Sequence, residues 1–129
     1  HNTGEVAAMV LLACETDFVS KNEEFGALAR EIAMHVAAQN PKYISRDEVT
    51  EEEMTKAKEV FSGEVADKPA EMQEKIMEGK LSSYFKEQIL LEQPFIKNPD
   101  TTIGEMVTGA VQKFGENVTV VEVKRLSVK

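Results

Sequence analysis

Apolar positions follow two different spacings along the chain, and each spacing predicts one kind of element. Residues 6–14 are apolar at every position, which indicates a central strand that is covered on both faces. From there on the apolar positions recur three or four residues apart, as on one side of a helix, at Phe25, Leu28, Ala29, Ile32 and Val36. The spacing of Ser20 and Glu23 predicts a capping box at the start of this helix, and Pro41 predicts its end.

The middle of the chain is predicted to be helical, with thinner apolar stripes. Thr50 and Glu53 form a second capping box, so a charged surface helix is expected over residues 50–65. Residues 69–79 begin with a proline and end with a glycine, which is typical of a short helix. Residues 80–93 are expected to form a further helix that turns its apolar side to the core.

The last part of the chain completes the expected fold. Residues 94–99 are bracketed by two prolines and are expected to form a loop. A third capping box at residues 102–105 begins a helix that Gly115 ends, and the β-branched residues of 117–128 indicate a strand. The order of strand, five helical segments and strand predicts a single α+β domain over residues 1–129. Its first and last strands should pair in one small antiparallel sheet of about three strands, with the helices packed on it.

Composition narrows the choice of partners. The formal net charge is −8, from 15 basic and 23 acidic residues, which argues against nucleic acid as a partner because its phosphate backbone repels an acidic surface. The single cysteine, Cys14, excludes an internal disulfide and suits the reducing cytoplasm or an organelle matrix. No apolar run approaches the roughly 20 residues that a transmembrane helix needs, so no membrane partner is expected.

Few residues are candidates for catalysis. Glu15 and Asp17 lie two positions apart after the first strand and could act as acid and base, and Cys14 could pair with His35 as nucleophile and base. Simpler interpretations are favoured, because Cys14 continues the apolar strand as a small buried residue, and His35, between Met34 and Val36 on a helix, is expected to be packed or at the solvent edge. The sequence has no phosphate-binding loop, dinucleotide motif, nucleophile elbow or metal-ligand spacing. We therefore expect neither an enzyme nor a bound metal or cofactor.

Phe18 raises a separate question, because the chain must turn at T-D-F-V between the first strand and the following helix. In one interpretation its ring packs against Ala27 or Leu28 and so staples the helix start. In the other it is an exposed anchor for a partner protein, since a rigid aromatic side chain buries a large area at a small entropic cost. The spacing of the residues does not choose between these two interpretations.

Four separated segments carry motifs of one known protein family. The first, HNTGEVAAMVLLACETDFVSKNEEF, contains a C-x-T-D-F-V-A-x-N-like motif in which Ser20 replaces the common alanine. The others are LAREIAMHVAAQNPKYISRDEV, EKIMEGKLSSYFKEQILLEQPFIKNPDTTIGEMV and GENVTVVEVKRL. In these segments, and in their order, the chain resembles the elongation factor Ts family over essentially all of its 129 residues.

The resemblance implies a guanine-nucleotide exchange factor that promotes release of GDP from elongation factor Tu during translation, without covalent chemistry. Carried onto this sequence, Phe18 is the residue that wedges into the partner near its magnesium and nucleotide site, and Asp17 accompanies it. Thr16 and Val19 shape the corner around them. These four residues are the expected partner-binding site.

The family also provides expectations about assembly. The chain is similar to the core, or dimerisation, domain of single-core members, in which case the family's upstream helical domain and a further edge strand are missing. The turn-forming residues 1–5 agree with a strand before them. Single-core relatives form dimers, so a homodimer is expected, through the β-branched edge of residues 118–128. The alternative is a structural dimerisation core that needs the missing domain for exchange.

Overall fold

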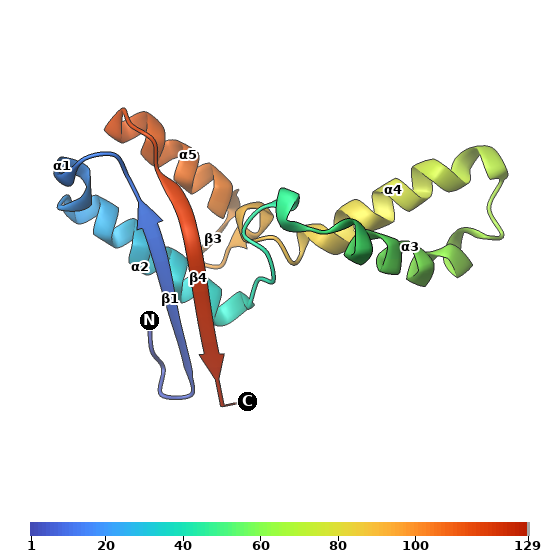
Figure 1. Cartoon of the computed structure of the whole chain (residues 1–129), viewed down its shortest axis with the longest axis horizontal. Coiled ribbons are helices and arrows are strands. Elements are labelled where there is room, and N and C mark those ends of the chain that lie inside the picture. The colour runs from blue at the N-terminus through green and yellow to red at the C-terminus, as the bar shows by residue number, and fades with distance from the viewer. Residues whose placement is uncertain (129) are drawn as a thin grey trace.

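The structure is built on a long two-stranded antiparallel ribbon (Figure 1). The computed structural model describes residues 1–128. Strand β1 (Val6–Ala13) pairs with strand β4 (Thr119–Ser127), so the first and last predicted strands are neighbours, as expected. The register shifts once, at a bulge between Leu11 and Leu12. With its helices and short antiparallel sheets, the chain has the predicted α+β fold.

Two helices cover one face of the ribbon and form the main core with it. Helix α2 (Glu23–Gln39) runs along the ribbon, and α5 (Ile103–Phe114) packs against α2 and against the 3₁₀ turn η2 (Leu90–Glu92). The residues buried between these elements are Ala8, Ile32, Val36, Ala37, Leu90, Phe95, Ile103 and Val120. The apolar stripe predicted for α2 is confirmed, because Ile32 and Val36 are completely or almost completely buried.

The other face of the ribbon is exposed, so the prediction that residues 6–14 are covered on both faces is wrong. Met9 and Leu126 are each 75% exposed, and Leu11 is 57% exposed. The reason is that α2 and α5 lie on the same side, and alternate residues of a strand point to opposite faces. Among the described residues, β1 and β4 have only each other as long strand neighbours, and the N-terminal residues add one short bridge to β1.

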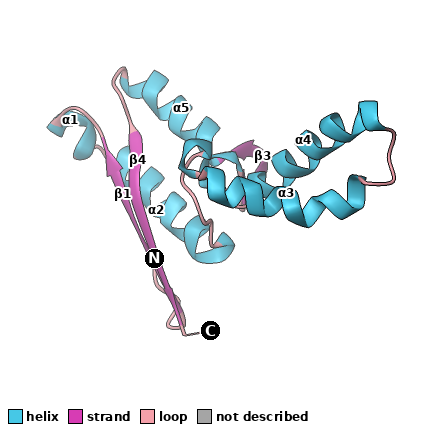
Figure 2. Cartoon of the chain, turned by 45° about the vertical axis from the view of Figure 1, so that its right-hand side comes forward, coloured by secondary structure: helices cyan, strands magenta, loops and turns pink. Residues whose placement is uncertain are grey.

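Helices α3 (Glu51–Val65) and α4 (Ala70–Lys86) form a hairpin that projects away from the ribbon (Figures 1 and 2). They pack on each other and not on the sheet, which differs from the prediction. Helix α4 is continuous, so the predicted break at Gly79 is wrong. Phe85 of α4 is buried in one cluster with Ala57 of α3, and this packing outweighs the cost of about 1 kcal/mol for a glycine within a helix.

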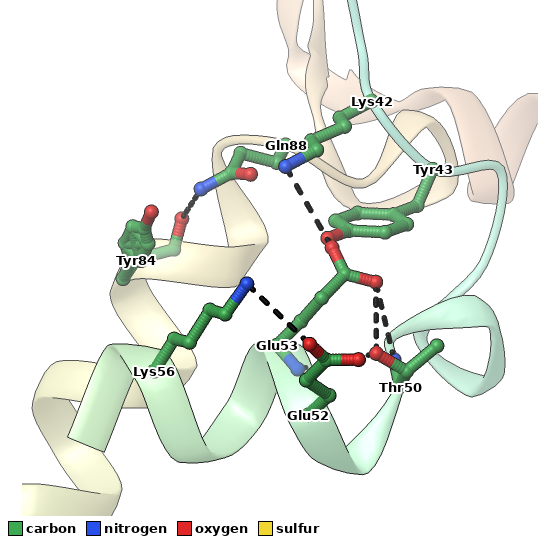
Figure 3. A network of polar contacts seen from close by, with 8 residues as sticks. All are labelled: Lys42, Tyr43, Thr50, Glu52, Glu53, Lys56, Tyr84 and Gln88. Atoms are coloured by element: carbon green, nitrogen blue, oxygen red, sulfur yellow. Dashed lines mark hydrogen bonds and ion pairs between the residues drawn. The ribbon is translucent and has the colours of Figure 1, made fainter. Parts of the chain in front are cut away.

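A polar network ties the base of this hairpin to the main body (Figure 3). The Thr50 hydroxyl accepts a hydrogen bond from the Glu53 amide at 3.1 Å, which confirms the predicted capping box. The Glu53 carboxylate also accepts a hydrogen bond from the Tyr43 hydroxyl, and it lies 3.6 Å from the Lys42 amine. Because Lys42 and Tyr43 belong to the segment that leaves α2, these contacts hold the hairpin in place relative to the ribbon.

The segment between α4 and α5 also differs from the prediction. Helix α4 ends at Lys86, earlier than expected. Residues 94–99 are not a plain loop, because β2 (Pro94–Phe95) pairs with β3 (Asn98–Thr102) in a second small antiparallel sheet. The Phe95 ring lies in the main core, and its burial holds this segment against the body. The strands are therefore divided between two pairs instead of being gathered in one sheet.

Candidate partner-binding site

The chain turns between β1 and α2 through the four-residue helix α1 (Asp17–Ser20). The capping box predicted for Ser20 and Glu23 is wrong. The Ser20 hydroxyl donates to the Asp17 carbonyl oxygen at 3.1 Å, and so closes α1 instead of starting α2. Asn22 caps α2, since its side-chain oxygen accepts a hydrogen bond from the Glu24 amide at 2.8 Å.

Phe18 points away from the protein at this corner. Its side chain is 91% exposed, so the interpretation that Phe18 packs on Ala27 or Leu28 as a staple is wrong. The next residue, Val19, is buried in a cluster with Phe25, Ala110 and Val118. Val19 therefore attaches α1 to the body, while the residue before it presents an aromatic ring to solvent.

Thr16 and Asp17 have different environments at the start of α1. Thr16 is the N-cap residue, in an extended backbone conformation (φ −131°, ψ 157°), yet its side chain makes no capping hydrogen bond to α1. Asp17 is exposed, and within residues 1–128 its carboxylate makes no hydrogen bond or ion pair. An acid and an aromatic ring are thus available side by side at the corner.

A carboxylate from the far end of the chain holds this corner. Glu116 Oε2 accepts hydrogen bonds from the backbone amides of Glu15 at 2.6 Å and Thr16 at 2.8 Å, and its Oε1 accepts one from the Thr16 hydroxyl at 2.7 Å. In return, Glu15 Oε2 accepts a hydrogen bond from the Asn117 amide at 2.6 Å. We call these four hydrogen bonds the Glu15–Glu116 clasp. The Thr16 hydroxyl, assisted by the two backbone amides, holds the pKa of Glu116 below its ordinary value.

Sequence reasoning missed Glu116. It lies directly after Gly115, which ends α5 in the left-handed conformation (φ 71°), as predicted. A glutamate after such a glycine has no distinctive spacing, and it is 100 residues from Thr16. The one available signal is the pairing of the first and last strands, because that pairing brings the turn after β1 close to the turn before β4.

The residues considered for catalysis are not brought together as a catalytic site. His35 is completely buried, its Nε2 lies 2.9 Å from Gln93 Oε1, and its Nδ1 accepts a hydrogen bond from the Ile96 amide at 3.3 Å. Both ring nitrogens are therefore occupied, and burial lowers the pKa of His35. Cys14 is partly buried, and its thiol donates to the Thr16 carbonyl oxygen at 3.3 Å. The packed interpretation of His35 is confirmed, and Cys14 is less buried than expected.

Within the part of the chain that the structure describes, no group of three or more His, Cys, Asp or Glu residues is arranged to hold a metal ion. Across residues 1–128, no helix has the length and apolar character that crossing a bilayer requires. The exposed corner around Phe18 is thus the main candidate site, and its residues are suited to contact with another protein.

Comparison with known proteins identifies the family. A sequence model of the family described as Elongation factor TS matches residues 1–129. The chain belongs to the elongation factor Ts family. It is 46% identical over 125 residues to elongation factor Ts of Thermodesulfovibrio yellowstonii, a match that covers 96% of this chain and 63% of the relative. It is 46% identical over 122 residues to elongation factor Ts of Heliobacterium modesticaldum, covering 93% of this chain and 57% of that relative.

A third relative shows the same relationship at lower identity. Elongation factor Ts of Koribacter versatilis is 41% identical over 130 residues, which cover 99% of this chain and 59% of the relative. The chain therefore spans about three fifths of the length of the relatives it matches. By their name these relatives are elongation factors, that is, proteins that take part in protein synthesis. The activity of these longer proteins is therefore only a proposal for this chain.

Proposed function

We propose that this chain acts as a guanine-nucleotide exchange factor for elongation factor Tu, and that Asp17 and Phe18 contact the partner near its magnesium and nucleotide site. The observation that supports this proposal is the Phe18 ring, 91% exposed on a short helix that Val19 attaches to the core. An aromatic ring held outside its own fold offers its whole area to a partner. The corner residues Thr16 and Val19 complete the proposed site by fixing the backbone on either side.

The proposed mechanism requires a difference in affinity between two states of the partner. Magnesium and a phosphate-binding loop hold GDP through charge and backbone amides, and a ring inserted beside them favours a conformation in which these groups are displaced. The exchange factor lowers nucleotide affinity only as far as it binds this displaced conformation more tightly. Burial of one Phe side chain supplies roughly 1.5–3 kcal/mol, so other contacts of the chain must supply the rest.

Asp17 has a separate part in this proposal. Its carboxylate is free of contacts among the described residues, so it can accept hydrogen bonds from the partner at no cost to the fold. A negative charge beside a magnesium site also competes with the phosphates and carboxylates that hold the ion. No covalent bond is made or broken in this role, so the chain would not be an enzyme in the usual sense. The proposed partner works in the bacterial cytoplasm or in an organelle matrix.

The proposal is tested by the release of a fluorescent GDP analogue from elongation factor Tu. Release should accelerate as the concentration of this chain increases and should reach a limiting rate. Phe18→Ala should remove most of the acceleration while the fold is unchanged. If the folded parent chain leaves the rate of release unchanged at every concentration, the proposed exchange function is wrong for this chain.

A second candidate function, a dimerisation core, is supported by the exposed face of the ribbon. Met9, Leu11 and Leu126 are exposed apolar side chains on that face, and among the described residues the outer edge of β4 is open, whereas that of β1 is partly paired through the Asn2–Ala7 bridge. We therefore also propose a homodimer, and sedimentation or light scattering would measure it. Leu126→Glu should shift the chain toward monomer, because a charge on a buried contact is costly. A dimer without exchange activity would favour the dimerisation core, in which a further domain is needed for exchange.

A further inference from the structure

We propose that Glu116 is a positioning residue for the exchange reaction: through the Glu15–Glu116 clasp, its carboxylate fixes the backbone that aims Phe18 at the partner. This inference rests on the proposed exchange function. Glu116 acts through Thr16 and Glu15, whose amides it binds, and it does not need to touch the partner itself.

Helix α1 is too short to set its own direction. It has four residues, and the first turn of a helix fixes several backbone dihedral angles for a single hydrogen bond, so it is unstable alone. Its orientation must come from contacts at its two ends. Val19 provides one of them, through its burial against Phe25 and Val118. At the other end, before Asp17, the Glu116 carboxylate binds both the amide and the hydroxyl of Thr16, and the partly buried Cys14 adds a longer contact from its thiol to the Thr16 carbonyl oxygen at 3.3 Å.

The N-cap of α1 shows why an outside acceptor is needed. A threonine in this position normally uses its hydroxyl oxygen to accept a hydrogen bond from an amide of its own helix. Here the Thr16 side chain makes no such bond, and its hydroxyl instead donates to Glu116 Oε1 at 2.7 Å. The Thr16 amide donates to Oε2 of the same carboxylate at 2.8 Å. Two hydrogen bonds from Thr16 to the planar Glu116 carboxylate restrict both the position and the rotation of Thr16.

The clasp joins two turns that lie at the same end of the ribbon (Figure 1). Glu116 binds the turn after β1, and Glu15 binds the Asn117 amide in the turn before β4. An ion pair between Lys113 and Glu24 joins the end of α5 to the start of α2 nearby. Hydrogen bonds therefore run in both directions between the two turns, and the segment from Thr16 to Phe18 begins at a residue whose backbone is fixed.

The test compares Glu116→Ala with the parent chain in two measurements. Amide hydrogen exchange at Glu15 and Thr16 needs no partner, and in the variant it should rise toward the rate of an unprotected amide. In the GDP-release assay, the concentration that gives half-maximal acceleration should increase by about threefold to tenfold, the usual effect of releasing one or two ordered groups at an interface. The limiting rate at saturation should stay close to that of the parent, because the bound state still contains Phe18.

Two further variants separate positioning from other roles. Glu116→Gln keeps the shape of the clasp: its amide oxygen can accept from both backbone amides, and its amino group can donate to the Thr16 hydroxyl oxygen. It should restore most of the lost acceleration. Glu78→Ala removes an exposed acid from α4, far from the corner, and should match the parent in both measurements.

The outcomes distinguish this inference from the function on which it rests. If the parent accelerates GDP release and Glu116→Ala does so equally well, the positioning role is overturned although the exchange function stands. Protected amides at Glu15 and Thr16 in Glu116→Ala would also overturn it. If Glu116→Gln behaves like Glu116→Ala in the release assay while its amides remain protected, the charge acts directly on the partner and positioning is again overturned. A parent chain without activity overturns the exchange function, and the positioning role with it.

Discussion

Phe18 and Val19 are neighbours in the sequence, but the structure predicts opposite consequences for their replacement by alanine. Phe18 is 91% exposed, whereas Val19 is 6% exposed in a cluster with Phe25 and Val118. Phe18→Ala removes almost no contact within the chain, so the free energy of unfolding should change by less than about 0.5 kcal/mol. Its effect should appear only when the partner is present.

The size of that effect follows from the area of the ring. Full burial of a Phe side chain against a partner is worth roughly 1.5–3 kcal/mol, and each 1.4 kcal/mol is a factor of ten in affinity. Phe18→Ala should therefore weaken binding to elongation factor Tu by about tenfold to a hundredfold. Val19→Ala deletes two buried methyl groups, so it should lower the free energy of unfolding by roughly 2 kcal/mol.

Two assays separate these effects. Urea unfolding followed by circular dichroism gives the stability of each variant, and calorimetric or fluorescence titration gives its affinity for the partner. Below the unfolding transition, Val19→Ala should still bind the partner. Its affinity should be lower than that of the parent only as far as the substitution disorders the corner. The reasoning is refuted if Phe18→Ala unfolds at a clearly lower urea concentration than the parent, or if it binds with the affinity of the parent.

The remaining predictions concern helix α5 and the buried His35. Gly104→Ala should lower the free energy of unfolding by about 1–3 kcal/mol, because the added Cβ would lie 2.7 Å from the Leu91 carbonyl oxygen. Gly109→Ala, in the same helix but with no neighbour within 4 Å, should raise it by about 0.5–1 kcal/mol, and chemical denaturation of the pair checks both signs. Burial lowers the pKa of His35, so the unfolded chain binds the proton first as pH falls. Unfolding measured against pH should show stability that is fully present above the ordinary pKa near 6.5 and decreases below it, and His35→Gln should flatten this profile.

Local signals in the sequence predicted the helix starts where a single residue could act as the cap. The box at Thr50 is present, and the Thr102 hydroxyl accepts from the Glu105 amide at 3.1 Å, as its spacing predicts. The prediction failed at Ser20 because Asn22, an equally good cap, lies two residues later. Burial of Val19 holds α1 against the body, so Ser20 lies at the end of α1, and this tertiary contact is not contained in the spacing.

Packing between distant segments explains the other differences. Gly79 lies within a continuous helix because Phe85 packs against α3. The outer residues of β1 are exposed because α2 and α5 both cover the same face of the ribbon. At the site, sequence alone identified Phe18 as a candidate anchor but left its direction open. The clasp could not be predicted, since Glu116 lies 100 residues from Thr16 and meets it only after β1 and β4 have paired.

The pairing of the first and last strands also sets the order in which the molecule can be assembled. Contacts of α3 with α4 are local and can form early, whereas Val6 faces Ser127 across almost the whole chain. During synthesis, the residues around Phe18 leave the ribosome long before Glu116 and β4 do. A nascent chain therefore carries the aromatic ring on an unfixed segment, and the corner is fixed only after Glu116 has been synthesised and β4 has paired with β1. Incomplete chains would then be unable to occupy the partner, although they already contain every residue of the exposed motif.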